Sequence, residues 1–543
     1  MFESISTEKD IEQLKKRIAK DEALFARILK IRANLKYTHR GEAGMMPTNA
    51  ELLALYHEML SSGKEKENRR TELLLRKIKT KSNSGVAVVS LLTKPFPCPG
   101  RCTYCPTEAN MPKSYLSKEP AAARALANDF DVRKQIFSRL EALLVNGHPI
   151  DKIEVIIIGG TWSFYHSSYR EFVIKECFRA CNEFAQIKEG QPLIPENDGT
   201  SRTLEELQKI NETAHCRIVG LSIETRPDYI NEDEIARLRK YGVTKVEIGV
   251  QHLDNGVLEE TKRGMTAESV AQCTELLRNA GLKIVYHMMP NLPGSTPEKD
   301  IAMFKELFRD ETGFQPDMLK MYPCMVLEGS ELYQTWKEGN FRPYTNEELM
   351  HVLREAKKLV PPYVRILRVI RDIPADYIKA GSIISNMREW LLVDQKKNGW
   401  KCRCIRCREI REKEISTEDF ILKQLEYRTP SGKEIFLSFE DEKRDILASF
   451  LRLRLPGATA FLPELEGASL VRELHTYGRL SPIDKQGDQS QHRGFGKRLL
   501  EEAENISRKS GYKKIAVISG VGVREYYRKF GYTLEGTYMV KKL

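Results

Sequence analysis

Six short apolar runs, each followed by a longer stretch of helical periodicity, constrain the fold of this chain more than any other feature. Each run is nearly continuous in apolar residues, as expected for parallel strands covered on both faces. Alternation of such strands with helices is typical of a parallel β/α sheet, and six strands would form an incomplete TIM-like barrel. The runs are residues 86–92, 152–160, 217–225, 245–251, 283–289 and 318–323.

A loop with three cysteines follows the first predicted strand. Cys98, Cys102 and Cys105 have the spacing C-x3-C-x2-C. This spacing lets one short loop bind three irons of a 4Fe–4S cluster, and it leaves the fourth iron open to a small molecule such as S-adenosylmethionine (SAM). A zinc site or buried structural cysteines are the alternative. Zinc would require a fourth ligand, and the nearest downstream cysteine is Cys177.

The cysteine motif resembles that of the radical-SAM superfamily, whose usual architecture is an open (β/α)6 barrel. We therefore expect an α/β fold with such a barrel at residues 83–330. Functional residues gather at the C-terminal ends of barrel strands. The candidates there for binding SAM are Gly159 and Gly160, Glu224 and Arg226, and Gln251. Ordinary turn chemistry explains any one of them alone, but their recurrence at successive strand ends favours a site.

The composition indicates a soluble, cytoplasmic protein of two to four domains. The chain has 543 residues, of which 41% are apolar and 30% charged, and it lacks an apolar run of membrane-spanning length or a signal-peptide pattern. Eleven cysteines, odd in number and clustered, fit a reducing compartment with metal sites. The net charge of +11 suggests a polyanionic partner.

The first 82 residues predict a basic helical arm. Between Lys64 and Lys81 there are eight Lys or Arg against three Glu. A solvated helix face explains such a run. Because the run leads directly into the first barrel strand, a surface that contacts the phosphate backbone of a nucleic acid is the other interpretation.

A second cysteine group lies in residues 331–412, which we expect to form a linker. Cys402, Cys404 and Cys407 have the spacing C-x-C-x2-C. This density favours a zinc site, for which Cys324 is our candidate fourth ligand. A redox-active or unliganded group of three thiols is the alternative.

Residues 413–543 predict an α+β domain with a glycine-rich turn before a helix. Gln491, Gly494 and Gly496 have the pattern Q-x-x-G-x-G, which directs backbone N–H groups toward a pyrophosphate at the helix N-terminus. This order resembles the GNAT acetyltransferase fold, whose corresponding loop binds acetyl-CoA. In that fold a later helix carries a tyrosine near the thioester sulfur, and Tyr526 or Tyr527 would fill this role.

Two polar residues lie on the strand before the glycine-rich turn. Glu473 and His475 occupy alternate positions and therefore point to one face. Either residue could position a thioester or act as a base. The alternative is that both merely satisfy a half-buried strand.

A radical-SAM barrel followed by a GNAT domain resembles the catalytic subunit of Elongator, in its stand-alone archaeal or bacterial form. The resemblance covers nearly the whole chain and includes the segments IETRPDY, HMMPNLPG, RDIPADYI, VRELHTYG and FGKRLLEEAE. It implies a tRNA carboxymethyluridine synthase that acts on the wobble uridine of the anticodon stem-loop. The acetyl-CoA contacts that it implies are Lys152, Glu473, Leu474, His475, Thr476, Phe495, Gly496, Lys497 and Tyr527.

The resemblance also implies SAM, a 4Fe–4S cluster, an external electron donor, and either a homodimer or Elongator-like partner subunits. Two other functions remain open from the sequence. The chain could be a protein lysine acetyltransferase with a structural iron–sulfur domain, or a tRNA-binding module without turnover.

Overall fold

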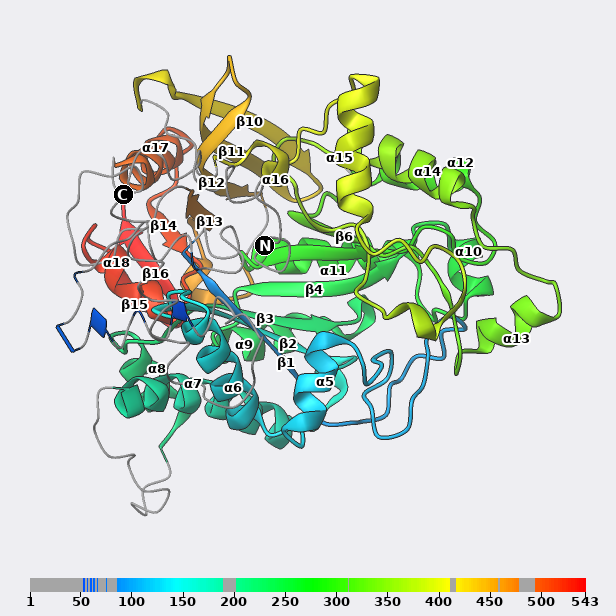
Figure 1. Ribbon diagram of the computed structural model, residues 1–543. Helices are drawn as coiled ribbons and strands as arrows, with labels where there is room; N and C mark the ends of the chain where they lie inside the picture. The colour runs from blue at the N-terminus through cyan, green and yellow to red at the C-terminus, as the bar shows by residue number, and fades with distance from the viewer. Residues whose placement is uncertain are drawn as a thin grey trace, which may run out of the picture. The chain divides into compact units, whose positions relative to one another are not determined.

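The computed structural model describes residues 85–188, 202–310, 312–410, 417–457, 460–477 and 494–543, with a few residues between 52 and 75. Its larger compact unit, Val88–Ile136 and Ile153–Leu543, contains two seven-stranded sheets (Figure 1). The basic arm expected over residues 1–82 lies almost entirely outside the described residues. A small apolar cluster is described there, formed by Leu52, Leu53, Tyr56, Met59 and Leu75.

The first sheet contains all six predicted strands and a seventh that was not predicted. Its order is β1-β2-β3-β4-β5-β6-β8, and the pairs from β3 to β8 are parallel. The additional strand β8 comes from the segment expected to be a linker. The strands are β1 Ala87–Leu92, β2 Lys152–Ile158, β3 Arg217–Thr225, β4 Lys245–Gln251, β5 Lys283–Met288, β6 Met318–Met321 and β8 Arg365–Arg368.

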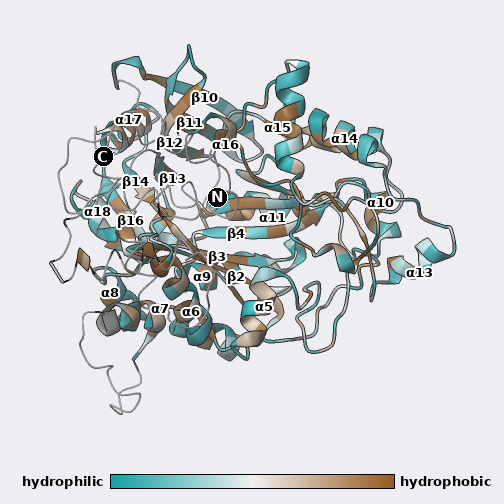
Figure 2. Cartoon of the chain, in the orientation of Figure 1, coloured by the Kyte–Doolittle hydropathy of each residue, from teal (hydrophilic) through white to brown (hydrophobic). Residues whose placement is uncertain are grey.

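Helices between these strands begin where the sequence supplies caps. Thr203 and Thr345 each form a capping box at the start of α8 and α14, and Asn231 caps α9. In Figure 2 the ribbons of α14 and α15 contain both brown and teal residues, as expected for helices with one buried face. The helices are α5 Pro120–Ala127, α6 Val132–Val145, α7 Ser167–Lys188, α8 Leu204–Asn211, α9 Glu232–Lys240, α10 Asn255–Glu260, α11 Ala267–Asn279, α12 Pro297–Glu306, α13 Glu331–Lys337, α14 Asn346–Leu359, α15 Met387–Asn398 and α16 Ile405–Arg408.

Short elements complete this part of the chain. The 3-10 helices η1 Trp162–Phe164 and η2 Pro227–Tyr229 follow β2 and β3, and η3 Ala375–Tyr377 precedes β9. A separate antiparallel pair is formed by β7 Val326–Leu327 and β9 Ile378–Ala380. None of the described helices is long and apolar enough to cross a membrane.

The second sheet belongs to the C-terminal domain and has the order β10-β11-β12-β13-β14-β16-β15. It is antiparallel except for β13 and β14, which are parallel and are connected through α17. The elements are β10 Ile421–Thr429, β11 Gly432–Asp441, β12 Ile446–Pro456, β13 Ala468–Thr476, α17 Phe495–Lys509, β14 Lys514–Val517, α18 Arg524–Arg528, β15 Thr533–Glu535 and β16 Tyr538–Lys542, with the short turns η4 Thr417–Asp419, η5 Pro463–Leu465 and η7 Val521–Val523.

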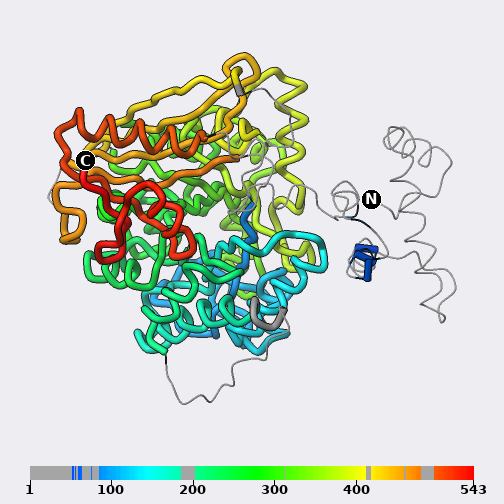
Figure 3. Tube along the Cα trace, turned by 90° about the vertical axis from the view of Figure 1, so that its left-hand side faces the viewer, coloured from blue at the N-terminus to red at the C-terminus, as the bar shows by residue number. Residues whose placement is uncertain are grey.

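The C-terminal domain packs on the N-terminal ends of the barrel strands. Arg472 of β13 donates to the carbonyl of Leu282, directly before β5, at 2.8 Å, and pairs with Asp317, directly before β6. Arg365, the first residue of β8, donates to the hydroxyl of Tyr477 at 2.7 Å. In Figure 3 the orange and red segments of this domain lie directly against the green segments of the barrel. The C-terminal ends of the barrel strands, where the cysteine loop begins, are therefore at the opposite side.

Candidate cofactor sites

The cysteine loop follows β1 and presents three partly exposed thiols. The amide of Cys105 donates to the carbonyl of Cys102 at 3.1 Å, which makes the loop a tight turn. The thiol of Cys98 lies 3.7 Å from the hydroxyl of Thr161, at the end of β2. Partial exposure and a common loop fit three ligands of a cluster whose fourth iron stays accessible. Cys98, Cys102 and Cys105 share this one loop, and their role as cluster ligands stays a prediction.

Two buried arginines face this loop, and sequence reasoning gave only one of them a role. Arg263, in the turn before α11, donates to the sulfur of Cys102 at 3.5 Å. Arg226 is held by a bidentate pair with Asp228 at 2.9 Å, and its Nη1 has no hydrogen-bond partner. A Cβ atom placed on Gly100 of the loop would lie 2.6 Å from that Nη1. Arg226 is therefore directed at the cysteine loop.

The strand ends around the loop have backbone with positive φ angles and a buried acceptor atom without a hydrogen-bond partner. Gly159 and Gly160 have φ angles of 134° and 106°, which residues with a side chain rarely adopt. A Cβ on Gly160 would meet only the carbonyl of Lys113, at 4.0 Å, so space remains beside it. Gln251 has a φ of 72° at a bulge in β4, and its buried Oε1 has no hydrogen-bond partner. These features fit a small polar ligand such as SAM.

Inside the barrel a chain of charged side chains begins at Glu224, a predicted SAM contact. Its carboxylate accepts from Tyr115 at 2.5 Å and lies 3.4 Å from Nδ1 of His287. The other nitrogen of His287 lies 2.9 Å from Glu247, which also pairs with Lys320. Burial acts to raise the pKa of Glu247, but Lys320 and His287 hold it well below its usual range.

The chain of charges continues toward the N-terminal ends of the strands. Lys245 pairs with Glu154, and both lie near Lys283, the first residue of β5. Nζ of Lys283 is 4.0 Å from Glu473 of β13. TIM barrels usually fill this interior with branched apolar residues. The charged interior was not predicted, because in the sequence each charged residue looks like an isolated polar position within an apolar strand.

The predicted pair on β13, Glu473 and His475, lies where this row of charges reaches the N-terminal ends of the barrel strands. Glu473 accepts from Arg452 at 2.9 Å. Burial acts to raise the pKa of Glu473, but Lys283 and Arg452 together lower it. Burial lowers the pKa of His475 to about 4, and its Nε2 is buried without a hydrogen-bond partner. Glu473 is thus ionised and His475 neutral at pH 7, with one imidazole nitrogen free for a ligand.

The start of α17 and the hydroxyl of Tyr526 meet at the end of β13. Gly494 forms the N-cap of α17 with a φ of 77°, and Phe495 anchors the helix by stacking on Phe439 at 4.5 Å. A Cβ on Gly496 would lie 2.9 Å from the hydroxyl of Tyr526 and 3.7 Å from Oγ1 of Thr476. Free N–H groups at a helix start fit a phosphate.

The other predicted acetyl-CoA residues are less closely grouped. Tyr527 is buried and its ring lies 5.9 Å from that of Tyr532. Lys497 is exposed and pairs with Glu501 at 3.7 Å, and Leu474 is partly buried on β13. Lys152 opens β2. Gln491 lies outside the described residues.

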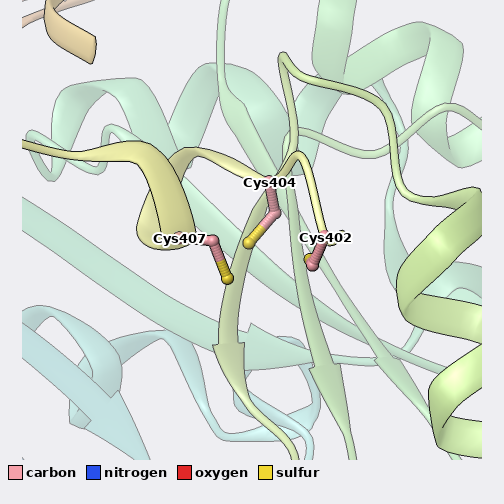
Figure 4. A group of neighbouring side chains, drawn as sticks. All are labelled: Cys402, Cys404 and Cys407. Carbon is pink, nitrogen blue, oxygen red and sulfur yellow. The ribbon is translucent and has the colours of Figure 1, made fainter. Parts of the chain in front are cut away.

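The second cysteine group is compact, but the expected fourth ligand is not part of it. The sulfurs of Cys402, Cys404 and Cys407 lie within 4.8 Å of one another and point to a common centre (Figure 4). Sulfurs on one tetrahedral zinc are about 3.8 Å apart, so the spacing fits a single ion. The thiols of Cys402 and Cys407 hydrogen-bond Cys404 and hold its pKa well below its usual value.

Cys324 lies elsewhere, which corrects our prediction. It follows the C-terminal end of β6 and packs in an apolar cluster with Tyr104 of the first cysteine loop. The three-cysteine group lies beside the N-terminal end of β8, where the amide of Ile405 donates to Val364 at 2.9 Å. Since β6 and β8 are parallel neighbours, opposite ends of the sheet separate the two positions. Chain spacing alone carries no such information.

Comparison with known proteins agrees with this architecture. Residues 97–307 match the Radical SAM superfamily, and residues 316–398 match the Radical_SAM C-terminal domain. The chain is thus a radical-SAM protein, a class whose cofactors are a 4Fe–4S cluster and SAM, and its second sheet lies outside both matches. The second match also explains why β8 lies in the segment that we expected to be a linker.

Full-length relatives define the family more narrowly. The tRNA uridine(34) acetyltransferase of Methanocaldococcus jannaschii is 44% identical over 95% of this chain and 94% of its own length. Elongator complex protein 3 of Schizosaccharomyces pombe is 40% identical over 87% of this chain and 88% of its own length. The solved structure of Methanocaldococcus infernus Elp3, with residues 1–46 deleted, is 43% identical, covers 85% of this chain and 100% of that chain, and has a TM-score of 0.72. This chain belongs to the family of tRNA uridine(34) acetyltransferases and Elongator complex protein 3, as the sequence motifs predict.

Proposed function

We propose that this chain is a tRNA-modifying enzyme that makes 5-carboxymethyluridine at the wobble position, with acetyl-CoA as the source of the two added carbons. One observation carries the proposal beyond family membership. The candidate acetyl-CoA residues of β13 and the candidate SAM residues at the cysteine loop lie at the two ends of one barrel, and charged side chains line the interior between them. A single reaction that uses both cofactors requires the two bound groups to meet, and the charged barrel interior lies between their candidate sites.

Each group of residues has a distinct part in this proposal. Bound at the cysteine loop, the cluster and SAM supply a carbon radical. Gly160, Gln251 and Glu224 offer backbone and side-chain acceptors to the polar groups of SAM. The N-terminus of α17 binds the pyrophosphate of acetyl-CoA. Neutral His475 accepts a hydrogen bond from the water that hydrolyses the thioester, beside ionised Glu473.

The test is an anaerobic assay of the reconstituted full-length protein with SAM, dithionite, acetyl-CoA and unmodified tRNA, followed by nucleoside mass spectrometry. We expect carboxymethyl on the wobble uridine, and its loss in Cys102→Ser and in Gly494→Asp. Cys177→Ser, which changes a buried cysteine of α7, is the matched control and should keep activity. Acetylated protein that still forms in Cys102→Ser would instead identify a protein lysine acetyltransferase.

We also propose that Cys402, Cys404 and Cys407 bind one zinc ion, with the fourth position left to water or another ligand. Metal analysis of the purified protein should find one zinc per chain. The ion should be lost in Cys404→Ser and retained in Cys324→Ser. Loss of zinc in Cys324→Ser would restore the original four-cysteine assignment.

The remaining partners are proposed from the same observations. An external donor must reduce the cluster, and the eleven free cysteines favour a reducing cytoplasm. A relative named as a protein of the Elongator complex favours Elongator-like subunits as partners, and a homodimer is the alternative. Light scattering on the isolated chain distinguishes a homodimer from a monomer that needs other subunits.

A further inference from the structure

Aromatic side chains form a continuous group at the C-terminal ends of three neighbouring strands. They come from the cysteine loop after β1, from η1 and the start of α7 after β2, and from η2 after β3. We call this group the aromatic rim. Its members are Phe96, Phe164, Tyr165, His166, Tyr169, Phe172 and Tyr229.

The rings of the rim are arranged as a ladder. Tyr165 stacks on Phe96 at 4.8 Å and on Tyr169 at 5.3 Å, and Tyr169 stacks on Phe172 at 6.4 Å. Phe164 lies 5.9 Å from Phe96. The ladder thus extends from the cysteine loop to the outer surface of α7.

Backbone groups at the ends of β1 and β2 hold the two tyrosines of the ladder in place. The hydroxyl of Tyr165 lies 2.8 Å from that of Thr93 and donates to the carbonyl of Lys94 at 2.9 Å. The hydroxyl of Tyr169 accepts from the amide of Lys94 at 3.0 Å. Polar atoms of these rings are therefore already engaged, and what the rim offers a ligand is aromatic surface.

Internal packing does not explain the exposed members. Phe164 is 38% exposed and Phe172 is 54% exposed. Among the phenylalanine and tryptophan side chains that the structure describes, one other is exposed to this degree, Trp390 of α15 at 49%. Two of the three thus lie on one rim, next to exposed Lys94, whose Nζ is 4.6 Å from the ring centre of Tyr169.

The rim borders the cysteine loop, the candidate site of the cluster. Phe96 is two residues before Cys98, and the thiol of Cys98 lies 3.7 Å from Thr161, directly before η1. Phe164 follows Thr161 by three residues and contacts Phe96, so the rim lies directly beside the cysteine loop.

Resting on the proposed function, we propose that the aromatic rim binds unpaired bases of the tRNA anticodon loop by stacking, beside the target uridine. Proteins recognise single-stranded RNA mainly by stacking its bases on aromatic rings. When a uridine is drawn into a reaction site, the neighbouring bases lose a stacking partner, and the rings of the rim stack on them instead. Lys94 supplies the positive charge that the adjacent phosphates require.

The experiment measures binding of the full-length protein to two labelled RNAs, an anticodon stem-loop and a fully paired duplex of equal length. We expect Phe164→Ala and Phe172→Ala each to weaken stem-loop binding about 5- to 100-fold, from the usual effect of removing a stacked ring. Duplex binding should not change. Trp390→Ala, which removes an equally exposed ring elsewhere, should leave both affinities unchanged.

Two further variants separate stacking from folding. Phe164→Leu keeps an apolar side chain without a ring and should bind the stem-loop as weakly as Phe164→Ala, whereas Phe164→Trp should restore binding. Wild-type affinity in Phe164→Leu would overturn the proposal, and so would equal losses for both RNAs.

The outcomes also separate this proposal from the proposed function. Absence of modified uridine in the wild-type reaction contradicts the proposed function. Modified uridine in the wild type, together with unchanged stem-loop affinity in the rim variants, contradicts the rim alone. If those variants bind RNA normally but their cluster is reduced more slowly by a flavodoxin-type protein, the rim is a docking surface for the electron donor and the proposal is wrong.

Discussion

Arg263 is the residue whose position changes the chemistry of the cysteine loop most directly. It is buried, donates to the sulfur of Cys102, and also bonds the carbonyl of Gly249 in β4. Charge–charge attraction to Cys102 is among the contacts that raise the pKa of this arginine, against the effect of burial. A fixed positive charge at a ligand sulfur favours the reduced, more negative cluster.

We predict that Arg263→Gln lowers the reduction potential of the bound cluster, by an amount on the order of 60 mV, a tenfold change for one electron. The measurement is a redox titration followed by electron paramagnetic resonance. Arg101→Gln, at an exposed arginine of the same loop, is the control and should leave the potential unchanged. An unaltered potential in Arg263→Gln would show that this contact does not act on the cluster.

The partly buried imidazole of His475 contributes to the pH dependence of stability. Burial lowers its pKa to about 4 in the folded chain, below the ordinary value of about 6.5. Between these two values the unfolded chain binds a proton that the folded chain does not. Stability is therefore lost as the pH falls through this range, by at most about 1.4 kcal/mol per pH unit.

We predict that His475→Gln loses part of this dependence, so that the free energy of unfolding changes less between pH 6.5 and pH 4.5 than in the wild type. Urea unfolding at several pH values measures it. His351→Gln, at an exposed histidine of α14, should follow the wild type. Parallel curves for His475→Gln and the wild type would contradict the lowered pKa.

At the scale of elements, the end of β2 shows two adjacent glycines with different physical reasons. Both have positive φ angles. A Cβ on Gly159 would lie 2.1 Å from Oγ1 of Thr93, whereas one on Gly160 would meet only the carbonyl of Lys113, at 4.0 Å. Gly159 is required for the close approach of β1 and β2, and Gly160 for the conformation of the turn and the space beside it.

We predict that Gly159→Ala lowers the free energy of unfolding by about 2 to 5 kcal/mol, from backbone strain and overpacking together. Gly160→Ala should cost only the strain, about 1 to 3 kcal/mol. Urea unfolding without SAM compares the two variants. Adding Thr93→Ala should recover part of the loss in Gly159→Ala but none in Gly160→Ala. Equal losses in the two glycine variants would refute the assigned clash.

For the whole molecule, a buried group of charges joins the C-terminal domain to the barrel. Asp317 pairs with Arg472 and lies 3.5 Å from Arg452, and Arg472 also pairs with Glu434 at 3.0 Å. Burial acts to raise the pKa of Asp317, but Arg472 and Arg452 lower it. Its ionised form therefore stabilises the fold above the ordinary carboxylate pKa, and this contribution is lost as the pH falls through the lowered value.

We predict that Asp317→Asn destabilises the protein by about 3 to 5 kcal/mol, because two buried arginines, Arg472 and Arg452, each lose one of their two counter-charges. Urea unfolding measures the loss, and limited proteolysis should show the C-terminal domain cleaved faster. Glu331→Gln breaks the exposed pair with Lys262 and should cost no more than about 1 kcal/mol. A similar small cost for Asp317→Asn would mean that the charges do not hold the domains together.

Local patterns in the sequence determined much of the fold and supplied the candidate residues of each site. The six predicted strands were found almost to the residue, because two-sided burial requires continuous apolar runs. The cysteine loop, Gly159, Glu224 and the helix start at Gly494 were recognisable because their chemistry depends on neighbours in the chain. The strand β8 was missed because four residues, two of them arginine, carry no such pattern.

Tertiary structure alone decided how these parts combine. The placement of the C-terminal domain at the N-terminal ends of the barrel strands, the charges inside the barrel and the contact of Arg263 with Cys102 all join residues far apart in the chain. The separation of Cys324 from Cys404 has the same origin. Opposite ends of two parallel strands are distant in space, whatever the number of residues between the two cysteines in the sequence. Residue types specify which chemistry is available, and the packing of distant segments specifies which of those groups meet.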